Sequence, residues 1–177
     1  MGFDETHFID DFDQTKLLRK YITDQELYEN IVARYESKKA NEDLFIMSIS
    51  MQNHGGYTEK YDNFDEKVRL LGLNYPDVNQ YLSLVHESDS ALEYLISYFQ
   101  NVDDPVEIVF FGDHQPSLSS SFYPNLNGKG LSGLTEDELE DLYTIPFFIW
   151  TNYESTEVEL PITSINYLST LALERAG

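Results

Sequence analysis

Hydrophobic residues fall along this chain in two kinds of pattern, short continuous runs and longer stripes with helical spacing. Three runs, at residues 44–50, 106–111 and 145–150, are rich in β-branched and aromatic side chains and predict buried strands. Apolar residues spaced i, i+3, i+4 and i+7 over residues 77–100 predict the longest helix. Ser88 and Asp89 interrupt that stripe, which predicts that Asp89 faces the sheet and has a hydrogen-bond partner there.

Further helices are indicated by their starting signals. Thr23 and Glu26 have the spacing of a capping box and predict a helix that ends near residue 38. The same spacing at Thr135 predicts a short acidic helix over residues 135–143, and a last apolar stripe predicts one over 163–176. Strands and helices that alternate in this order predict an α/β fold with three layers, α/β/α, and a mostly parallel sheet. We expect one domain over residues 1–177.

Charge limits the partners that this chain can bind. Eleven basic and 32 acidic residues give a net charge of -21, which opposes binding to nucleic acid or to an anionic membrane. The chain has no cysteine, so neither a disulfide framework nor a thiol nucleophile is available. We expect a soluble chain, because no apolar run has the length of a signal peptide core or a transmembrane span.

Two polar clusters follow predicted strands, at the edge where open α/β sheets bind ligands. Asp113 and His114 come directly after the run 106–111 and Gly112. A carboxylate oxygen beside an imidazole nitrogen suits a divalent ion such as Mn²⁺, Zn²⁺ or Mg²⁺. The alternative is a carboxylate that caps a turn beside a surface histidine. His54 follows the run 44–50 and precedes two glycines; it is either a ligand contact or a side chain that hydrogen-bonds a tight turn.

With these residues placed, the chain resembles the C-terminal part of the catalytic domain in the lipoteichoic acid synthase and phosphoglycerol transferase family, within the alkaline phosphatase and sulfatase superfamily. The resemblance covers nearly the whole sequence and rests on several blocks in the family's order. They include Arg19-Lys-Tyr-Ile-Thr-Asp24, Phe45-Ile-Met-Ser-Ile-Ser-Met-Gln-Asn-His54-Gly-Gly-Tyr57, Phe111-Gly-Asp-His114, Pro146-Phe-Phe-Ile-Trp-Thr-Asn-Tyr153 and Ser164-Ile-Asn-Tyr-Leu-Ser169. The implied fold is alkaline-phosphatase-like and lacks the N-terminal strands.

The resemblance also implies roles for individual residues. Asp113 and His114 match two of the four ligands of a divalent ion, usually manganese, with Mg²⁺ and Zn²⁺ as alternatives. His54 matches a histidine that contacts the phosphoglycerol head group, and Arg19 lies near the place of a substrate-binding arginine. The family's nucleophilic threonine and its acidic metal ligand precede residue 1. This implies that the chain alone is inactive, with half of a metal site and part of a substrate pocket.

What the parent protein does follows from the same resemblance. It would be anchored in the membrane, face the outside of the cell, and transfer glycerol phosphate from a lipid donor to a polymer of the cell envelope, or hydrolyse a related phosphate or sulfate ester. The alternative is a stand-alone, non-catalytic relative that binds a ligand or partner. A sheet without its N-terminal strands has an open edge, so we also expect self-association.

Overall fold

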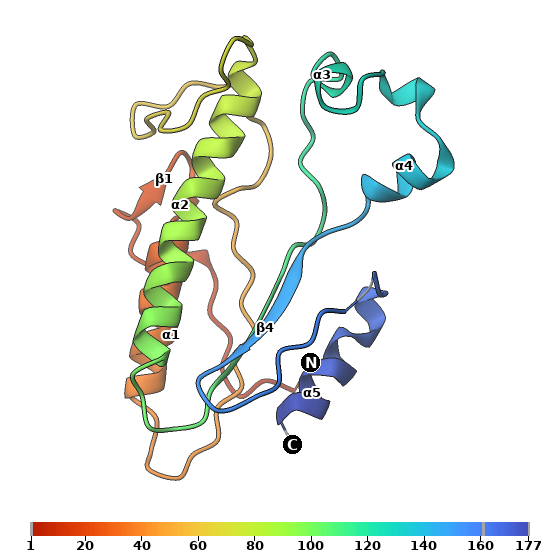
Figure 1. Ribbon diagram of the computed structural model, residues 1–177. Coiled ribbons are helices and arrows are strands. Elements are labelled where there is room, and N and C mark those ends of the chain that lie inside the picture. Colours follow the sequence, from red (N-terminus) through yellow and green to blue (C-terminus); the bar gives the residue numbers. More distant parts are fainter. Residues whose placement is uncertain (1, 161, 177) are drawn as a thin grey trace. The chain divides into compact units, whose positions relative to one another are not determined.

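The computed structural model describes residues 2–160 and 162–176. They form two compact units, which are described one at a time (Figure 1). The first unit runs to Tyr98 and includes Ser117–Ser119, and the second comprises Phe99–Pro116 and the residues from Ser120 onward. The single domain expected from the sequence stays a prediction.

The first unit is built on two long helices that lie side by side. Its elements in chain order are η1 (Ile9–Asp11), β1 (Leu17–Leu18), β2 (Tyr21–Ile22), α1 (Asp24–Glu36) and α2 (Pro76–Phe99), of which the last residue belongs to the second unit. The Ser88 hydroxyl contacts Asp24 at the start of α1, and the Tyr98 hydroxyl donates to Glu36 at its end. The two helices therefore run parallel.

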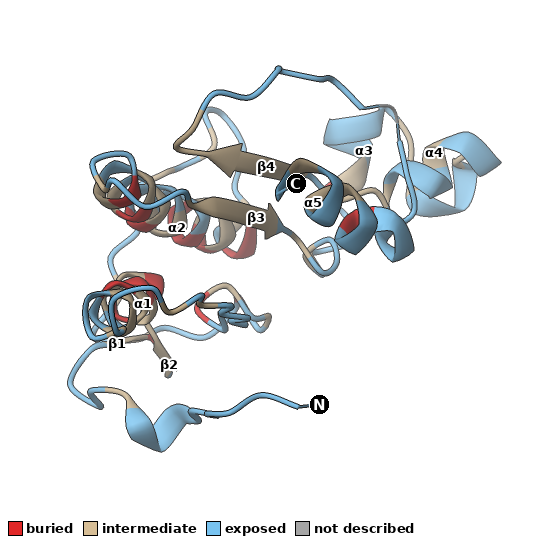
Figure 2. Ribbon diagram, turned by 90° about the horizontal axis from the view of Figure 1, so that it is seen from below, coloured by how far each residue is buried: buried red, intermediate tan, exposed pale blue. Residues whose placement is uncertain are grey.

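The core of the first unit lies on these helices, as the red residues of Figure 2 show. Leu84 of α2 is completely buried, and Val78, Ala91 and Leu95 follow its helical stripe. Tyr28 and Val32 are the buried apolar residues of α1. The predicted stripe of residues 77–100 is thus confirmed as a helix that buries one face.

Helix α1 begins as its capping signal predicts. The Thr23 hydroxyl accepts from the backbone N–H of Glu26 at 3.1 Å. The Glu26 carboxylate does not return to the cap; it accepts from the backbone N–H of Asp13 instead, at 3.3 Å. A side chain expected to cap its own helix therefore ties the preceding loop to the helix.

The predicted strand 44–50 is not a strand in the structure. No described residue pairs with this segment as a strand, and its apolar side chains after Leu44 are exposed. Phe45, Met47 and Ile49 are 77%, 58% and 74% exposed, while Ile46 between them is 39% exposed. The sequence pattern predicts a buried strand, but a strand forms only where a neighbouring strand accepts and donates its backbone hydrogen bonds. Such a neighbour is missing among the described residues.

The second unit contains a two-stranded sheet and several short helices. Its elements are β3 (Glu107–Phe111), α3 (Tyr123–Asn127), η2 (Leu131–Gly133), α4 (Glu136–Asp141), β4 (Phe147–Thr151), η3 (Ile165–Tyr167) and α5 (Leu168–Ala176). Thr135 and Glu138 form the predicted capping box of α4. Pro146 precedes β4, where its missing N–H does not interrupt the ladder.

The strand pairs in the structure are antiparallel. Strands β3 and β4 pair antiparallel, with Val109 opposite Ile149, and the hairpin of β1 and β2 is also antiparallel. The fold is mixed α/β, as predicted, but the strand pairs of the described residues do not include the predicted parallel ones, and the three-layer arrangement stays a prediction. The alternation of strands and helices predicts parallel strands only when each crossover returns to the same sheet in the same direction, and the segment 112–146 returns in the opposite one.

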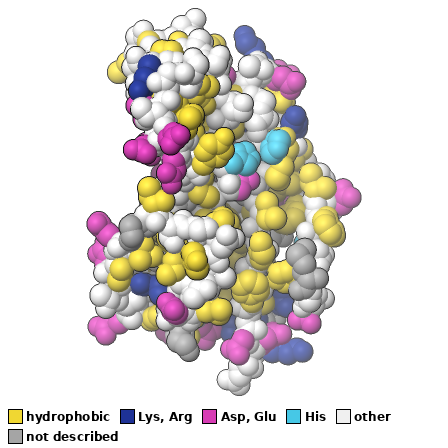
Figure 3. Space-filling view, turned by 90° about the vertical axis from the view of Figure 1, so that its right-hand side faces the viewer, with side chains coloured by type: hydrophobic (Ala, Val, Ile, Leu, Met, Phe, Trp, Pro, Cys, Tyr) yellow, Lys and Arg dark blue, Asp and Glu magenta, His cyan; other side chains and the backbone are white. Residues whose placement is uncertain are grey.

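Apolar side chains remain on the surface of both units. The strand residues of β3 and β4 are half-buried at most, and on the face drawn in Figure 3 hydrophobic side chains lie among charged ones. Within residues 2–160 and 162–176, the helices are all too short or too polar to cross a membrane.

Candidate functional site

Asp113 and His114 lie in the loop after β3, in the second unit. The hydrogen bonds between β3 and β4 extend to Gly112, whose N–H donates to the Pro146 carbonyl at 3.2 Å. Asp113 and His114 are the next two residues. Their exposed fractions are 82% and 70%. The bonds that order the pair are local: the Asp113 carboxylate accepts from the His114 backbone N–H at 2.8 Å.

The orientation of the His114 ring is informative. Its Nδ1 lies 2.9 Å from the carbonyl oxygen of Gln115. A carbonyl oxygen only accepts, so Nδ1 is the donor in this contact, and in the neutral form of the ring Nε2 would have the free lone pair. That nitrogen is 3.5 Å from Oδ2 of Asp113. Histidines that bind metals typically donate their other N–H in this way, so the pair fits a divalent cation as two of its ligands.

Asp113 and His114 are two candidate metal ligands without a third beside them among the described residues. Among the residues that the structure describes, no group of three or more His, Cys, Asp or Glu side chains is placed to hold a metal ion. A divalent cation on two protein ligands needs water or further protein groups to complete its shell. The roles predicted for Asp113 and His114 therefore stay predictions, although the local geometry suits them.

His54 lies in a tight loop of the first unit, which we define as residues 52–56 and call the His54 loop. The His54 ring is exposed, and its Nδ1 is 3.1 Å from the Tyr21 hydroxyl of the hairpin strand β2. The backbone N–H of His54 closes a turn on the Met51 carbonyl at 3.0 Å. Both alternatives from the sequence are compatible with this geometry, since the ring is exposed and its loop is a turn.

Arg19 holds this loop from beneath. It lies between β1 and β2 with a φ of 57°, and only 4% of the residue is exposed. Its Nη2 donates to the carbonyls of Gln52 at 2.9 Å and His54 at 2.7 Å, and its Nη1 donates to the carbonyl of Gly56 and the side chain of Gln80, both at 3.2 Å. Burial lowers the pKa of the guanidinium, but an arginine stays charged at neutral pH.

The rings of three tyrosines surround the same guanidinium. Tyr21, Tyr57 and Tyr61 have centroids 5.7, 5.6 and 5.9 Å from its Cζ, within the range of cation–π attraction. With four hydrogen bonds and three aromatic neighbours, the Arg19 side chain is engaged with its own unit. Direct contact between Arg19 and a substrate stays a prediction.

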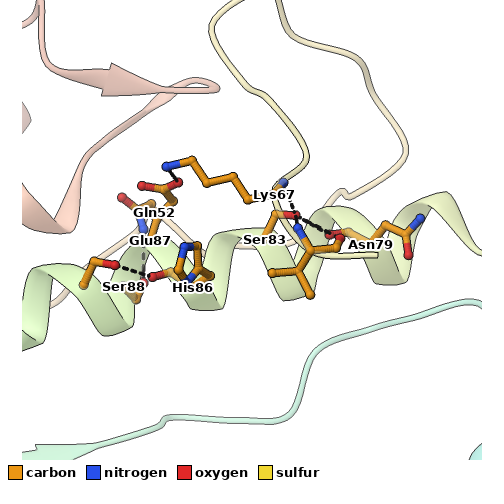
Figure 4. A network of polar contacts seen from close by, with 9 residues as sticks. Gln52, Lys67, Asn79, Ser83, His86, Glu87 and Ser88 are labelled. Atoms are coloured by element: carbon orange, nitrogen blue, oxygen red, sulfur yellow. Dashed lines mark hydrogen bonds and ion pairs between the residues drawn. The ribbon is translucent and has the colours of Figure 1, made fainter. Parts of the chain in front are cut away.

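A second polar cluster, centred on Ser88, fixes the start of the His54 loop (Figure 4). The Ser88 hydroxyl donates to Asp24 and accepts from the side-chain amides of Gln52 at 3.1 Å and Asn53 at 2.8 Å. The Gln52 side-chain oxygen accepts from the Asp24 backbone N–H at 3.1 Å. Burial raises the pKa of the Asp24 carboxyl, and the bond from Ser88 opposes that shift.

The sequence pattern selects the neighbour of Ser88 rather than Ser88 itself as the inward-facing residue. Asp89 was expected to face inward, but it is exposed, and Ser88 takes the internal position. The signal was present: a serine and an aspartate interrupt an apolar stripe, and of the two the serine can both donate and accept. Asp24 and Gln52 carried no comparable signal, since each is a common residue at a helix start or strand end.

The structure thus brings Arg19 and His54 together, and keeps Asp113 beside His114. These two pairs belong to different units, and each is a site feature of its own unit. The first unit thus contains an exposed histidine on a supported loop, and the second contains an exposed Asp–His pair after a strand.

Comparison with known proteins places this domain in a family. The family model described as Sulfatase matches residues 1–177, and the chain belongs to the sulfatase family. It is 34% identical over 121 residues to the capsular polysaccharide biosynthesis protein RkpI of Rhizobium meliloti (strain 1021), covering 68% of this chain. A protein of the same organism that is named for the modification of cyclic beta-1,2-glucan is 24% identical over 163 residues, or 89% of this chain.

A solved structure shows the fold. The phosphoglycerol transferase GacH of Streptococcus pyogenes, in complex with sn-glycerol-1-phosphate, superimposes with a TM-score of 0.65 at 22% sequence identity. The match covers 94% of this chain and 40% of GacH. The chain spans 21% and 25% of the two Rhizobium proteins. The resemblance seen in the sequence is therefore confirmed for the family and the fold.

Proposed function

We propose that this chain is the C-terminal portion of a metal-dependent, sulfatase-family phosphoglycerol transferase that acts on a polymer of the cell envelope. The main structural support is the His114 ring, whose Nδ1 lies on the Gln115 carbonyl and whose Nε2 lies 3.5 Å from Oδ2 of Asp113. Support for the substrate class comes from the neighbours: a transferase of phosphoglycerol shares the fold, and a protein of capsular polysaccharide biosynthesis is the relative at 34% identity. Hydrolysis of a phosphate or sulfate ester is the related reaction that the family name allows.

Asp113 and His114 would hold the cation, with Mn²⁺ as our first choice and Mg²⁺ or Zn²⁺ as alternatives. When bound, a divalent ion polarises a phosphoryl oxygen and lowers the pKa of a hydroxyl that attacks it. The chain itself would contribute by keeping the Asp113 oxygen and the His114 Nε2 close together in the loop after β3. The bond from His114 Nδ1 to Gln115 keeps that ring nitrogen protonated, and so leaves Nε2 to the cation.

His54 would bind the phosphate of the substrate. Its ring is exposed, and the Tyr21 hydroxyl lies at Nδ1, which leaves Nε2 directed to solvent. If the Tyr21 hydroxyl donates to Nδ1, the proton of the neutral ring is on Nε2, where it can donate to an anionic oxygen. A donor placed where negative charge develops lowers the barrier to phosphoryl transfer.

The nucleophile would come from outside residues 1–177. The resemblance implies a threonine on an earlier strand, and an acidic ligand near it, so the chain alone would be inactive. In the parent protein we expect a membrane anchor and a catalytic domain on the extracellular face, where a phosphoglycerol lipid and a growing polymer meet.

Titration calorimetry with Mn²⁺ tests the proposed cation ligands Asp113 and His114, which we call the half-site. We expect the chain to bind Mn²⁺ no more tightly than about millimolar, because two ligands leave most of the shell to water. Asp113→Ala and His114→Ala should abolish any binding that is measured, whereas His86→Ala, a histidine on α2, should not. Tight binding that both substitutions abolish would instead favour the stand-alone binding module. Binding that neither substitution changes would contradict the half-site.

Activity tests the reaction in the parent protein. We expect the protein expressed with its upstream coding sequence to release glycerol phosphate from a phosphoglycerol lipid, and to lose at least about a hundredfold in rate with His114→Ala. Failure of the parent protein to act on any phosphoglycerol donor, under conditions where it hydrolyses a sulfate ester, would assign it to the hydrolytic reaction.

We also propose that residues 45–51 pair with further strands in the parent protein and with a second copy in the isolated chain. The segment has no strand partner among the described residues, and Phe45, Met47 and Ile49 are exposed, as expected of a strand without its neighbours. We expect sedimentation to show dimers or larger species, and the pair of substitutions Met47→Lys and Ile49→Lys to give monomers. A wild-type chain that stays monomeric at high concentration would contradict this.

A further inference from the structure

The His54 loop turns alternate carbonyl oxygens toward one cation. The carbonyls of Gln52, His54 and Gly56 all accept from the Arg19 guanidinium. Residues 52, 54 and 56 are two apart, so the chain winds around the guanidinium with every second peptide oxygen directed inward. The shortest of these bonds, at 2.7 Å, is to the carbonyl of His54.

A peptide group that is fixed at its oxygen is also fixed at its N–H. The peptide bonds of the described residues are all trans, and in a planar trans peptide the C=O and the N–H point in opposite directions. The His54 carbonyl points toward Arg19, so the Gly55 N–H points away from it. A Cβ built on Gly55 would have no heavy atom within 4 Å, which leaves the backbone open to a ligand at this place.

We propose that Arg19 is a positioning residue that turns the Gly55 N–H outward beside the His54 imidazole, and that these two donors together bind one phosphate group. The identity of the ligand as a phosphoglycerol ester rests on the proposed function. Arg19 itself does not reach the ligand, because it is 4% exposed and its guanidinium already serves four acceptors.

The charge of Arg19 assists from behind the loop. The chain has a net charge of -21, so an anion approaches it against an unfavourable field. A buried guanidinium directly beneath the loop supplies positive potential behind the Gly55 N–H, which points away from it. The carbonyl oxygens are polarised toward the guanidinium, which makes the N–H at the other end of each peptide a better donor.

The first test needs no ligand. In ¹⁵N spectra of the 177-residue chain, we expect Arg19→Lys to shift or broaden the Gly55 amide and the His54 ring signals, because an ammonium cannot donate in a fork to several carbonyls. Arg34→Lys is the matched control, since Arg34 pairs with Glu5 on the same unit, and should leave both signals unchanged. Unmoved Gly55 and His54 signals in a folded Arg19→Lys chain would overturn the positioning role.

The second test uses sn-glycerol-1-phosphate as the probe, followed at the same signals. We expect Arg19→Lys and His54→Ala each to weaken binding roughly tenfold or more, the loss typical of a hydrogen bond to a charged group. In the double variant the effect of Arg19→Lys should shrink, because part of its effect acts through His54. Losses that multiply fully would mean that Arg19 acts independently of His54, and would overturn the proposal that it positions the two donors together.

Gly55 gives a test that does not depend on a buried arginine. Gly55 is not among the glycines with positive φ, so other residues fit its backbone. Gly55→Ala keeps the N–H and should change the affinity less than about twofold, whereas Gly55→Pro removes it and should cost roughly tenfold. Equal affinities for the two variants would overturn the part assigned to the N–H. If the wild-type chain binds no phosphate ester, the proposed function and the phosphate site both fail, while the ligand-free spectra still decide the role of Arg19.

Discussion

The two histidine loops of this chain are supported very differently. The His54 loop is held by a buried guanidinium, a serine on α2 and an aspartate on α1, and its supporting residues are 4% exposed or less at Arg19, Asp24 and Gln52. The Asp113 and His114 side chains are held by one bond within the pair and one to Gln115, while the loop around them is tied to the next strand only at its edges, by the Gly112 N–H on Pro146 and the Gln115 side chain on Thr144. One histidine loop thus rests on buried side chains, and in the other the two polar side chains are exposed and make only local bonds.

The difference predicts how each loop would respond to a ligand. A ligand loop on a supported scaffold can bind with little loss of conformational freedom. An exposed pair of ligands with local bonds has to be fixed by the cation or by further groups when they bind. We therefore expect changes in the first unit to alter the His54 loop at a distance, and changes around Asp113 to stay local.

The largest expected effect comes from the core beneath the supported loop. Leu84→Ala removes a fully buried side chain of α2 and should lower the free energy of unfolding by about 2–5 kcal/mol. Leu71, which is 96% exposed, provides the control: Leu71→Ala should change it by less than about 0.5 kcal/mol. Urea denaturation measures both, and a small effect of Leu84→Ala would mean that α2 does not support this unit.

Next in size is the serine at the centre of the polar cluster. Ser88→Ala leaves Gln52, Asn53 and Asp24 without their shared partner, and should cost about 1–3 kcal/mol together with faster amide exchange in the His54 loop. Ser90→Ala is the matched control, because Ser90 donates only to a carbonyl of its own helix. Equal exchange rates in the two variants would show that the loop keeps its order without Ser88.

A smaller effect depends on pH through Asp24. Burial raises the pKa of this carboxyl in the folded chain above the ordinary value of 3.8. The folded state therefore binds the proton more tightly, so this contribution to stability is complete below 3.8 and is lost as the pH rises through the folded-state pKa. Asp24→Asn cannot titrate. Measured by denaturation from about pH 3 to pH 7, the variant should gain stability relative to wild type as the pH rises. A difference that is constant with pH would contradict the raised pKa.

The smallest effect is expected at the exposed pair. Without metal, Asp113→Asn and His114→Gln should each change the free energy of unfolding by less than about 0.5 kcal/mol, because these side chains are 82% and 70% exposed. Thermal denaturation with and without Mn²⁺ measures this. A large loss of stability in the absence of metal would show that the loop is a structural element, and would remove the contrast with His54.

The helices and the two later strands could be predicted from the sequence because their signals are local. Thr23 and Thr135 cap helices, the stripe on α2 repeats along one helix, and the run after residue 106 has the residues of a strand. The pairing of strands is not local. Which strand lies beside β3, and whether it runs parallel, depends on where the chain returns, and no pattern within 107–111 encodes that.

The candidate residues divide in the same way. Asp113 and His114 could be selected because they follow a run that is a strand, and His54 because it follows a run with the composition of one, although that run is not a strand here. The hydrogen bonds of Arg19 are made with acceptors 33 to 61 residues away in the chain, so the resemblance that predicted a substrate contact for it did not reveal the loop that it holds. Residues 44–50 show a further limit of prediction from sequence. Their apolar pattern predicts a buried strand, but none of the described residues forms a strand beside them.

The backbone conformation of Arg19 has an energetic cost that its hydrogen bonds to the His54 loop must offset. A φ of 57° is a conformation that glycine adopts freely and that other residues occupy at about 1–2 kcal/mol. Glycine would relax the hairpin turn, but it would leave three carbonyl oxygens of the His54 loop without their cation. The hairpin is therefore a place where the local backbone and the neighbouring loop favour different residues, and the residue present is the one that keeps the His54 loop in shape at the expense of an easier turn.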